Sequence, residues 1–221
     1  MMTKELSLVH LIREPITAAR GAPPLLLLLH GVGSNELDLM ELVPKLDDGF
    51  FCVSARAPFR QGEDAYAWFH VEMTPSGPVI RPREAESSRE KLIGFIDELV
   101  EAYGLNPRKV FLMGFSQGAV MSLSVALTRP DKVAGIVAMS GRLLPEVLPL
   151  VAEVKALTGL PIFVAHGTMD AVLPIAHGRL ARDKLGAMRV DLDYREYSMG
   201  HEVSAQSLGD ISVWLSERLR S

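Results

Sequence analysis

The sequence has 221 residues, a length that fits one folded domain and lets roughly 70% of the unfolded surface be buried without disulfides or metals. Its net charge of −4 and the lack of a long basic run argue against a nucleic-acid partner. The one cysteine, Cys52, cannot form an internal disulfide, the first residues show no signal-peptide pattern, and no apolar run is long enough for a membrane span, so we expect a cytoplasmic protein.

Short apolar runs alternate with segments of helical periodicity along most of the chain. The runs predict strands at residues 6–12, 24–29, 50–56, 109–113, 133–139, 161–166 and 189–197. The periodic segments predict helices at residues 36–43, 84–103, 117–128, 146–157, 174–187 and 202–219. Strands separated by helices of this length form right-handed crossovers, so we expect one α/β domain over residues 1–221, with a mainly parallel sheet and helices on both faces. The first two strands are expected to form an antiparallel edge.

Two segments, 57–83 and 140–149, show no regular periodicity and contain several prolines. Both follow predicted strands, which places them at the carboxyl edge of the sheet, where open α/β folds bind ligands. Loops of this length in a compact domain are usually functional or mobile. We therefore expect the functional site at this edge.

Residues 110–118 read Val-Phe-Leu-Met-Gly-Phe-Ser-Gln-Gly and join a predicted strand directly to a predicted helix. A G-x-S-x-G pattern in this context is typical of a nucleophile elbow, a sharp turn that lifts a serine hydroxyl above the sheet. Gly114 and Gly118 lack the Cβ atoms that would clash in such a turn. We predict that Ser116 is a catalytic nucleophile.

A serine nucleophile needs a base, and in this kind of fold the chain order is serine, acid, histidine. His201 meets both order and position, because it follows the strand at 189–197 and precedes the last predicted helix. His166 precedes every strand-end aspartate that could serve it, and His177 lies within a predicted helix among charged residues, where a solvated helix face is expected. We predict that His201 is the base.

Asp170 is the best candidate for the acid, because it lies in a loop directly after the buried strand at 161–166. Asp131 precedes a strand and would emerge at the opposite edge, whereas the later aspartates lie inside predicted strands and helices. Capping of the following helix is the alternative role for Asp170.

Acyl transfer also needs N–H donors aimed at the developing oxyanion. The backbone N–H of Gln117, directly after the nucleophile, is the expected first donor, and the glycine-rich loop after the strand at 24–29 suggests Val32 N–H as the second. The alternative is a plain turn in which Ser34 or Asn35 caps the next helix, and the two interpretations are compatible. His30 is expected to be a hydrogen-bonded structural residue.

Five segments in this order resemble the carboxylesterase and acyl-protein thioesterase branch of the α/β-hydrolases: Leu29-His-Gly-Val-Gly, Gly114-Phe-Ser-Gln-Gly, Met139-Ser-Gly, His166-Gly-Thr-Met-Asp and Gly200-His201. The resemblance implies the α/β-hydrolase fold and a cofactor-free enzyme that hydrolyses carboxylic esters or thioesters. It also implies an oxyanion hole from Val32 and Gln117 and an acyl-binding groove near the loop that holds Trp68. Residues 34–38, Ser-Asn-Glu-Leu-Asp, differ from the eukaryotic thioesterases and favour a bacterial-type hydrolase of small esters.

Trp68, Phe115 and Met169 are predicted to contact the substrate, because they lie at the expected carboxyl edge. No insertion exceeds about 30 residues, so we expect no large cap domain and a preference for short to medium acyl chains. We expect no metal site and no cofactor. Homodimerisation is conceivable from the sequence, and amidase or peptidase chemistry on the same triad, or a non-catalytic binding protein of this fold, are the alternatives.

Overall fold

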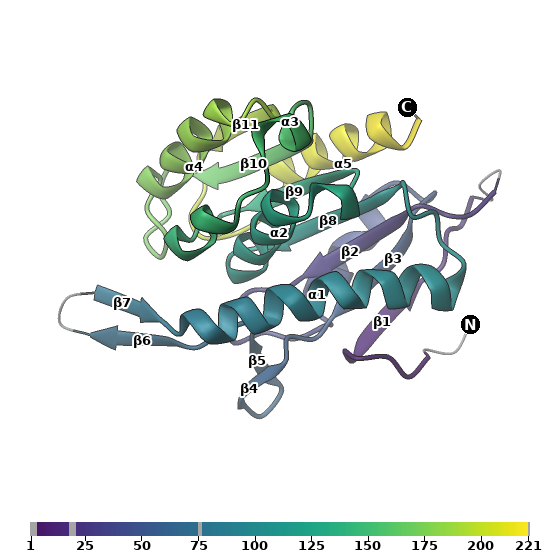
Figure 1. The fold of residues 1–221 in the computed structure, drawn as a ribbon, viewed down its shortest axis with the longest axis horizontal. Coiled ribbons are helices and arrows are strands. Elements are labelled where there is room, and N and C mark those ends of the chain that lie inside the picture. Colours follow the sequence, from purple (N-terminus) through teal and green to yellow (C-terminus); the bar gives the residue numbers. More distant parts are fainter. Residues whose placement is uncertain (1–3, 18–20, 75–76, 221) are drawn as a thin grey trace.

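The computed structural model describes residues 4–17, 21–74 and 77–220. Seven strands form one sheet in the order β1-β3-β2-β8-β9-β10-β11 (Figure 1). Their bounds are β1 His10–Arg13, β2 Leu25–Leu29, β3 Phe51–Ala55, β8 Val110–Phe115, β9 Gly135–Met139, β10 Pro161–Gly167 and β11 Asp191–Tyr197. All neighbouring pairs are parallel except β1 with β3. The predicted α/β-hydrolase class is confirmed, and β1 does form an antiparallel edge, although its partner is β3 and not β2.

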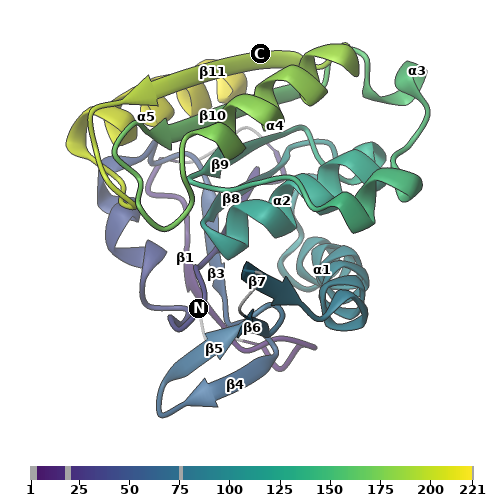
Figure 2. The same cartoon turned by 90° about the vertical axis from the view of Figure 1, so that its left-hand side faces the viewer.

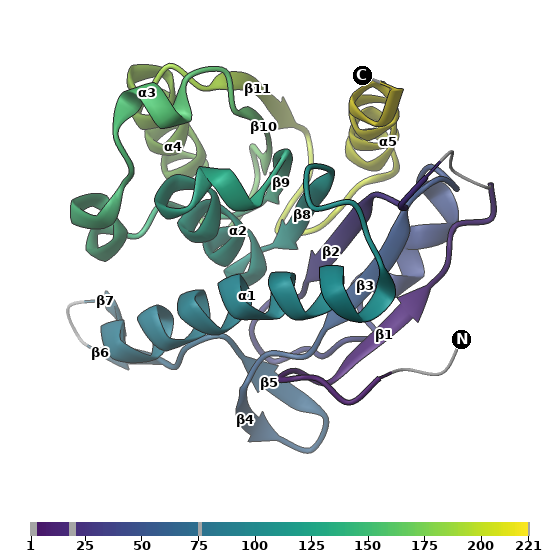
Figure 3. The same ribbon diagram turned by 45° about the vertical axis from the view of Figure 1, so that its right-hand side comes forward.

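Helices cover both faces of this sheet (Figure 3). The helical segments are η1 Leu39–Lys45, α1 Pro82–Tyr103, α2 Gln117–Thr128, η2 Pro130–Lys132, η3 Pro145–Leu150, α3 Val154–Leu157, α4 Ala176–Ala187 and α5 Ala205–Arg220. The five leucines of β2 show how one strand serves two cores, because alternate side chains point to opposite faces. Leu25, Leu27 and Leu29 pack in the cluster with α1 and α2, whereas Leu26 and Leu28 pack in the cluster with η1 and α5.

Segment 57–83 is more regular than the sequence predicted. It contains two hairpins, β4 Phe59–Gly62 with β5 Ala65–Ala67 and β6 Val71–Thr74 with β7 Gly77–Ile80. The β6–β7 hairpin extends past the start of α1 in Figure 1, and β4–β5 projects from the lower side in Figure 2. These short hairpins are the largest additions to the sheet within the described residues, and no large cap is evident.

Two predicted helices differ from the structure. The helix expected at 36–43 is the 3-10 segment η1, with Pro44 inside it. The helix expected at 146–157 is divided into η3 and the single turn α3, and Pro149 lies inside η3. Proline lacks the backbone N–H that a regular α-helix through Pro149 would require, which explains why only a short 3-10 segment forms there.

No helix in the described part of the chain combines the length and apolar character that crossing a membrane requires. The parallel strands instead position polar residues: β2, β8, β9, β10 and β11 all end at the same edge of the sheet, and the loops after them converge there.

Candidate active site

Ser116 lies between the end of β8 and the start of α2 with φ 53° and ψ −114°. Few non-glycine residues adopt this conformation, and such strain concentrates at functional sites. The crossing is tight. A Cβ on Gly118 would lie 1.9 Å from the carbonyl oxygen of Leu29, and one on Gly114 would lie 2.2 Å from the carbonyl oxygen of Gly118. Both elbow positions therefore require glycine.

The three side chains predicted to form the triad lie in one hydrogen-bonded chain. His201 Nε2 is 2.9 Å from Ser116 Oγ, and His201 Nδ1 is 2.7 Å from Asp170 Oδ2. The serine and the aspartate are buried, while the imidazole is partly exposed. In this arrangement Nδ1–H donates to the carboxylate and Nε2 accepts from the hydroxyl, which is the geometry that proton removal from serine requires.

The surroundings of Asp170 favour its ionised form. Burial alone would raise the pKa of this carboxyl, but the hydrogen bond from His201 and those from backbone amides outweigh it, so the pKa is lowered. Oδ1 accepts the N–H of Val172 at 2.9 Å and that of Leu173 at 2.7 Å. Because α4 begins only at Ala176, these bonds form a local turn and not the helix cap considered as the alternative.

The other two histidines near the acid do not contact Ser116. His166 is fully buried at the end of β10, where its Nε2 lies 2.7 Å from the Leu173 carbonyl and 3.6 Å from Asp170 Oδ2. It thus helps to hold the loop that carries the acid. His177 is half-buried in α4, less solvated than expected. Its pKa is lowered mainly by burial, and further by Arg142 and His166.

The turn containing Val32 lies directly against Ser116. Ser34 N–H donates to the Gly31 carbonyl at 3.3 Å. Gly33 has φ 79°, a left-handed conformation that glycine adopts without strain. A Cβ on Gly31 would be 3.4 Å from Ser116 Cβ. The backbone can therefore approach the reacting atoms closely, as an oxyanion donor must.

His30 fixes the orientation of this turn. Its Nδ1 lies 2.7 Å from the Gly31 carbonyl, and its Nε2 accepts the N–H of Ala57 at 3.0 Å. Burial lowers the pKa of His30, which suits this neutral tautomer. Because a trans peptide is planar, holding the Gly31 carbonyl on one side directs the Val32 N–H to the other. The N–H of Gln117 is the first of α2 and has no acceptor within the helix.

Trp68 corrects one prediction. Its side chain is fully buried, so the expectation that it contacts substrate is wrong. The indole Nε1 donates to the His30 carbonyl at 3.0 Å, while the Gln117 side chain accepts Trp68 N–H at 2.6 Å and donates to the Phe69 carbonyl at 2.7 Å. The β4–β5 hairpin pairs with this turn through Tyr66 and Ser34, a contact that no local sequence pattern indicates.

Phe115 and Met169 do lie near the triad. The Phe115 ring centroid is 4.9 Å from that of His201, and Met169 is 62% exposed in the loop just before Asp170. A pocket of about 250 Å³ opens beside the imidazole. It is lined by Asp38, Leu39, Glu41, Leu42, Phe115, His201, Glu202 and Val203.

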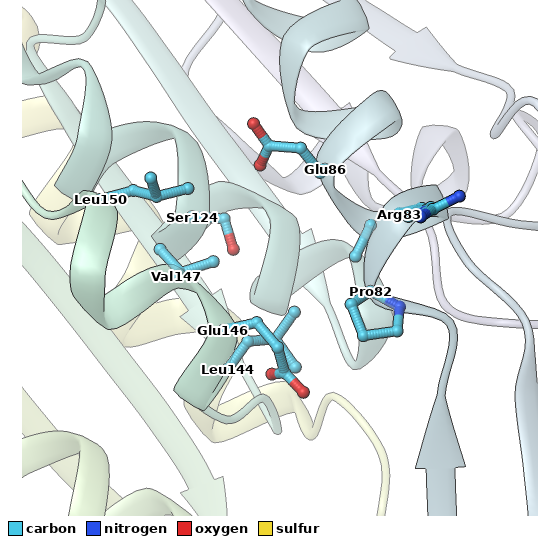
Figure 4. A pocket seen from close by; sticks show the side chains of 9 residues that line it. Pro82, Arg83, Glu86, Ser124, Leu144, Glu146, Val147 and Leu150 are labelled. Carbon is cyan, nitrogen blue, oxygen red and sulfur yellow. The ribbon is translucent and has the colours of Figure 1, made fainter.

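A larger pocket, of about 480 Å³, does not touch the triad. It lies between the start of α1, the middle of α2 and η3, with Pro82, Ser124 and Val147 around it (Figure 4). Size alone therefore does not locate the candidate site; the hydrogen-bonded chain does. Within the described residues, no group of three or more His, Cys, Asp or Glu side chains could hold a metal ion.

Known proteins resemble this chain over most of its length. The sequence pattern of the phospholipase/carboxylesterase family matches residues 13–219. Acyl-protein thioesterase 1 of Kluyveromyces lactis is 32% identical over 161 residues, which cover 70% of this chain and 69% of that protein. Carboxylesterase SOBER1 of Arabidopsis thaliana is 28% identical over 158 residues, covering 70% and 68%. The crystal structure of esterase PE8 superimposes with a TM-score of 0.83 at 27% identity, covering 96% of this chain and 99% of the other.

Proposed function

Because the chain belongs to the phospholipase/carboxylesterase family and is a hydrolase of the carboxylesterase type, we propose that Ser116, His201 and Asp170 cleave carboxylic esters or thioesters by way of an acyl-enzyme. One observation carries the proposal: the continuous hydrogen bonds from serine hydroxyl to imidazole to carboxylate, at 2.9 and 2.7 Å. A non-catalytic protein would not need these three groups in this order.

In the proposed mechanism, Ser116 Oγ attacks the acyl carbon while His201 Nε2 takes the hydroxyl proton. The carbonyl electrons move to oxygen, and the resulting oxyanion accepts hydrogen bonds from the amides of Val32 and Gln117. When the tetrahedral intermediate collapses, the imidazolium protonates the leaving alcohol or thiol. Water then attacks the acyl-enzyme with His201 again as base, and the acid product and free Ser116 are released. Asp170 stabilises the imidazolium in both halves without being protonated itself.

We propose short to medium acyl chains as the preferred substrates. The pocket beside His201 has a volume of only about 250 Å³, and its apolar lining includes Phe115 and Leu42. A series of p-nitrophenyl esters from acetate to palmitate measures this preference. The highest kcat/KM should occur between about four and eight carbons, a range that a pocket at the lower end of ligand-site volumes can hold. A maximum at palmitate would contradict the assignment.

Substitution of the nucleophile tests the function itself. Ser116→Ala should lower kcat by about 10⁶-fold, the scale of loss when a triad serine is removed, while circular dichroism shows an unchanged fold. A fluorophosphonate probe should form an adduct that mass spectrometry maps to Ser116. Ser54→Ala is the matched control, because this buried hydroxyl of β3 has no hydrogen-bond partner among the described residues. Near-normal hydrolysis by the Ser116 variant would remove that residue from the role.

A further inference from the structure

The loop after β9 passes between the nucleophile and the acid. In the sheet β9 lies between β8, which ends at the elbow, and β10, which leads to Asp170. The contact is close: a Cβ on Gly141 would lie 2.6 Å from Ala119 Cβ and 3.5 Å from the Ser116 carbonyl oxygen. The next residue is Arg142, so its backbone lies one residue from this contact with Ser116.

Arg142 is half-buried, yet among the residues that the structure describes its side chain has no hydrogen bond and no ion pair. The other buried or half-buried arginines of the described chain each pair with a carboxylate: Arg13, Arg56, Arg89, Arg129, Arg195 and Arg218. An arginine remains charged at all physiological pH values, and partial removal from water without a counter-charge is unfavourable. A guanidinium left in this state, on the residue that follows the Gly141 contact with Ser116, points to an anion supplied from outside the chain.

Further positive charge lies near Arg142, although the Asp170 carboxylate also interacts with the neighbouring His177. His177, half-buried at the start of α4, is close enough to Arg142 for the guanidinium to lower its pKa. The amino end of the 12-residue helix α4 adds partial positive charge. On the other side of His201 the small pocket carries Asp38, Glu41 and Glu202, which would repel an anion.

We propose that Arg142 is a specificity-determining residue that binds a carboxylate or phosphate group carried by the substrate. The enzyme would then prefer acidic esters or thioesters, such as a half-ester of a dicarboxylic acid, over neutral ones of the same shape. Guanidinium binds such groups through two parallel hydrogen bonds, which adds geometric selectivity to the charge. The inference rests on the proposed esterase function and names the substrate class for it.

Matched esters test the proposal. Monoethyl succinate and ethyl butyrate differ only in a carboxylate against a methyl group on the acyl side. O-butyrylglycolate and ethyl butyrate make the same comparison on the alcohol side. In the wild-type enzyme, kcat/KM for at least one charged ester should exceed that of its neutral match. Arg142→Gln should lower this charged-to-neutral ratio by about ten-fold to a hundred-fold, the scale of a hydrogen bond to a charged group.

Two further variants make the result specific. Arg142→Lys, which keeps the charge but not the fork of donors, should retain part of the ratio. Arg108→Gln removes an exposed arginine that precedes β8 at the opposite edge and should keep the wild-type ratio. Because each ratio is taken within one variant, partial misfolding does not alter it. A decrease of less than three-fold in Arg142→Gln for both ester pairs overturns the proposal, and a larger decrease supports it.

Binding separates this inference from the function on which it rests. If the wild-type protein hydrolyses no ester of either kind, the proposed function fails. Isothermal titration calorimetry with succinate then decides the anion site alone: binding to wild type that is weakened by Arg142→Gln supports it. Equal affinity for the two proteins, or no binding to either, overturns it.

Discussion

Asparagine in place of Asp170 would keep the shape of the side chain but change which atoms can accept a hydrogen bond. Oδ1 of the aspartate accepts two backbone N–H groups, from Val172 and Leu173, and Oδ2 accepts the proton of His201 Nδ1. An amide has only one oxygen. If its NH₂ group replaced Oδ1 it would face two donors, so the oxygen remains there and the NH₂ group points at His201.

This forced orientation determines the size of the effect. An NH₂ donor requires Nδ1 of His201 to be an acceptor, so the imidazole carries its proton on Nε2, which faces Ser116 Oγ at 2.9 Å. That nitrogen can then no longer accept the serine proton. We expect kcat to fall by about 10⁴-fold, equivalent to about 5.5 kcal/mol of barrier, as for the wrong tautomer in other triads. Both backbone hydrogen bonds persist, so the melting temperature should stay near that of the wild type.

The assay is hydrolysis of p-nitrophenyl butyrate at pH 8, with thermal unfolding followed by circular dichroism. Asp183→Asn, in which an exposed carboxylate of α4 is changed in the same way, should keep wild-type kcat. If the Asp170 variant retained more than a tenth of wild-type kcat, the orientation of His201 by this carboxylate would not be required, and the reasoning would be refuted.

Two predictions concern stability. Gly118→Ala should lower the melting temperature by about 6–12 °C, because its Cβ would overlap backbone 1.9 Å away and overpacking of about 3 kcal/mol has that effect in a chain of this size. Gly94→Ala is the control and should be slightly stabilising, because no atom lies within 4 Å of the added Cβ. Equal melting temperatures for the two variants would contradict this prediction. Glu36 pairs with Arg56 through two hydrogen bonds of 2.6 and 2.5 Å, which hold its pKa below the ordinary value of 4.5. A lowered carboxyl pKa stabilises the fold above pH ~4.5 and this contribution is lost on acidification, so the stability advantage of wild type over Glu36→Gln in urea unfolding should shrink from pH 7 to pH 3.5. An advantage that stayed constant or grew at low pH would contradict that assignment.

The sequence best predicted the features that depend on a few residues close together in the chain. The elbow is one continuous segment whose tight backbone crossing restricts Gly114 and Gly118 to glycine, so its pattern around Ser116 can be recognised without the rest of the chain. The parallel arrangement of the strands then predicts which distant residues lie close together. Residues that follow strand ends must share one edge, which is why Asp170 and His201 could be selected among several aspartates and histidines and do lie together.

Segment 57–83 was predicted poorly, because its structure comes from contacts with distant residues. Its strands are three or four residues long, too short for a clear two-residue alternation. Trp68 looked exposed for want of a local partner, yet its partners are His30 and Gln117, 38 and 49 residues away along the chain. The unpaired state of Arg142 could not be predicted either, since no sequence pattern indicates that a side chain lacks a counter-charge.

The irregular segment nevertheless links the two proposed oxyanion donors. From Gln117 a side-chain hydrogen bond reaches the backbone of Trp68, the indole reaches the His30 carbonyl, and the His30 ring reaches the carbonyl of Gly31, whose peptide carries the Val32 N–H. The distance between the two amides is therefore held by a buried chain of hydrogen bonds and not only by the strands beneath. Because donors must be positioned before the charge develops, the proposed mechanism gives this chain of hydrogen bonds, and with it segment 57–83, a role in holding the two donors in place.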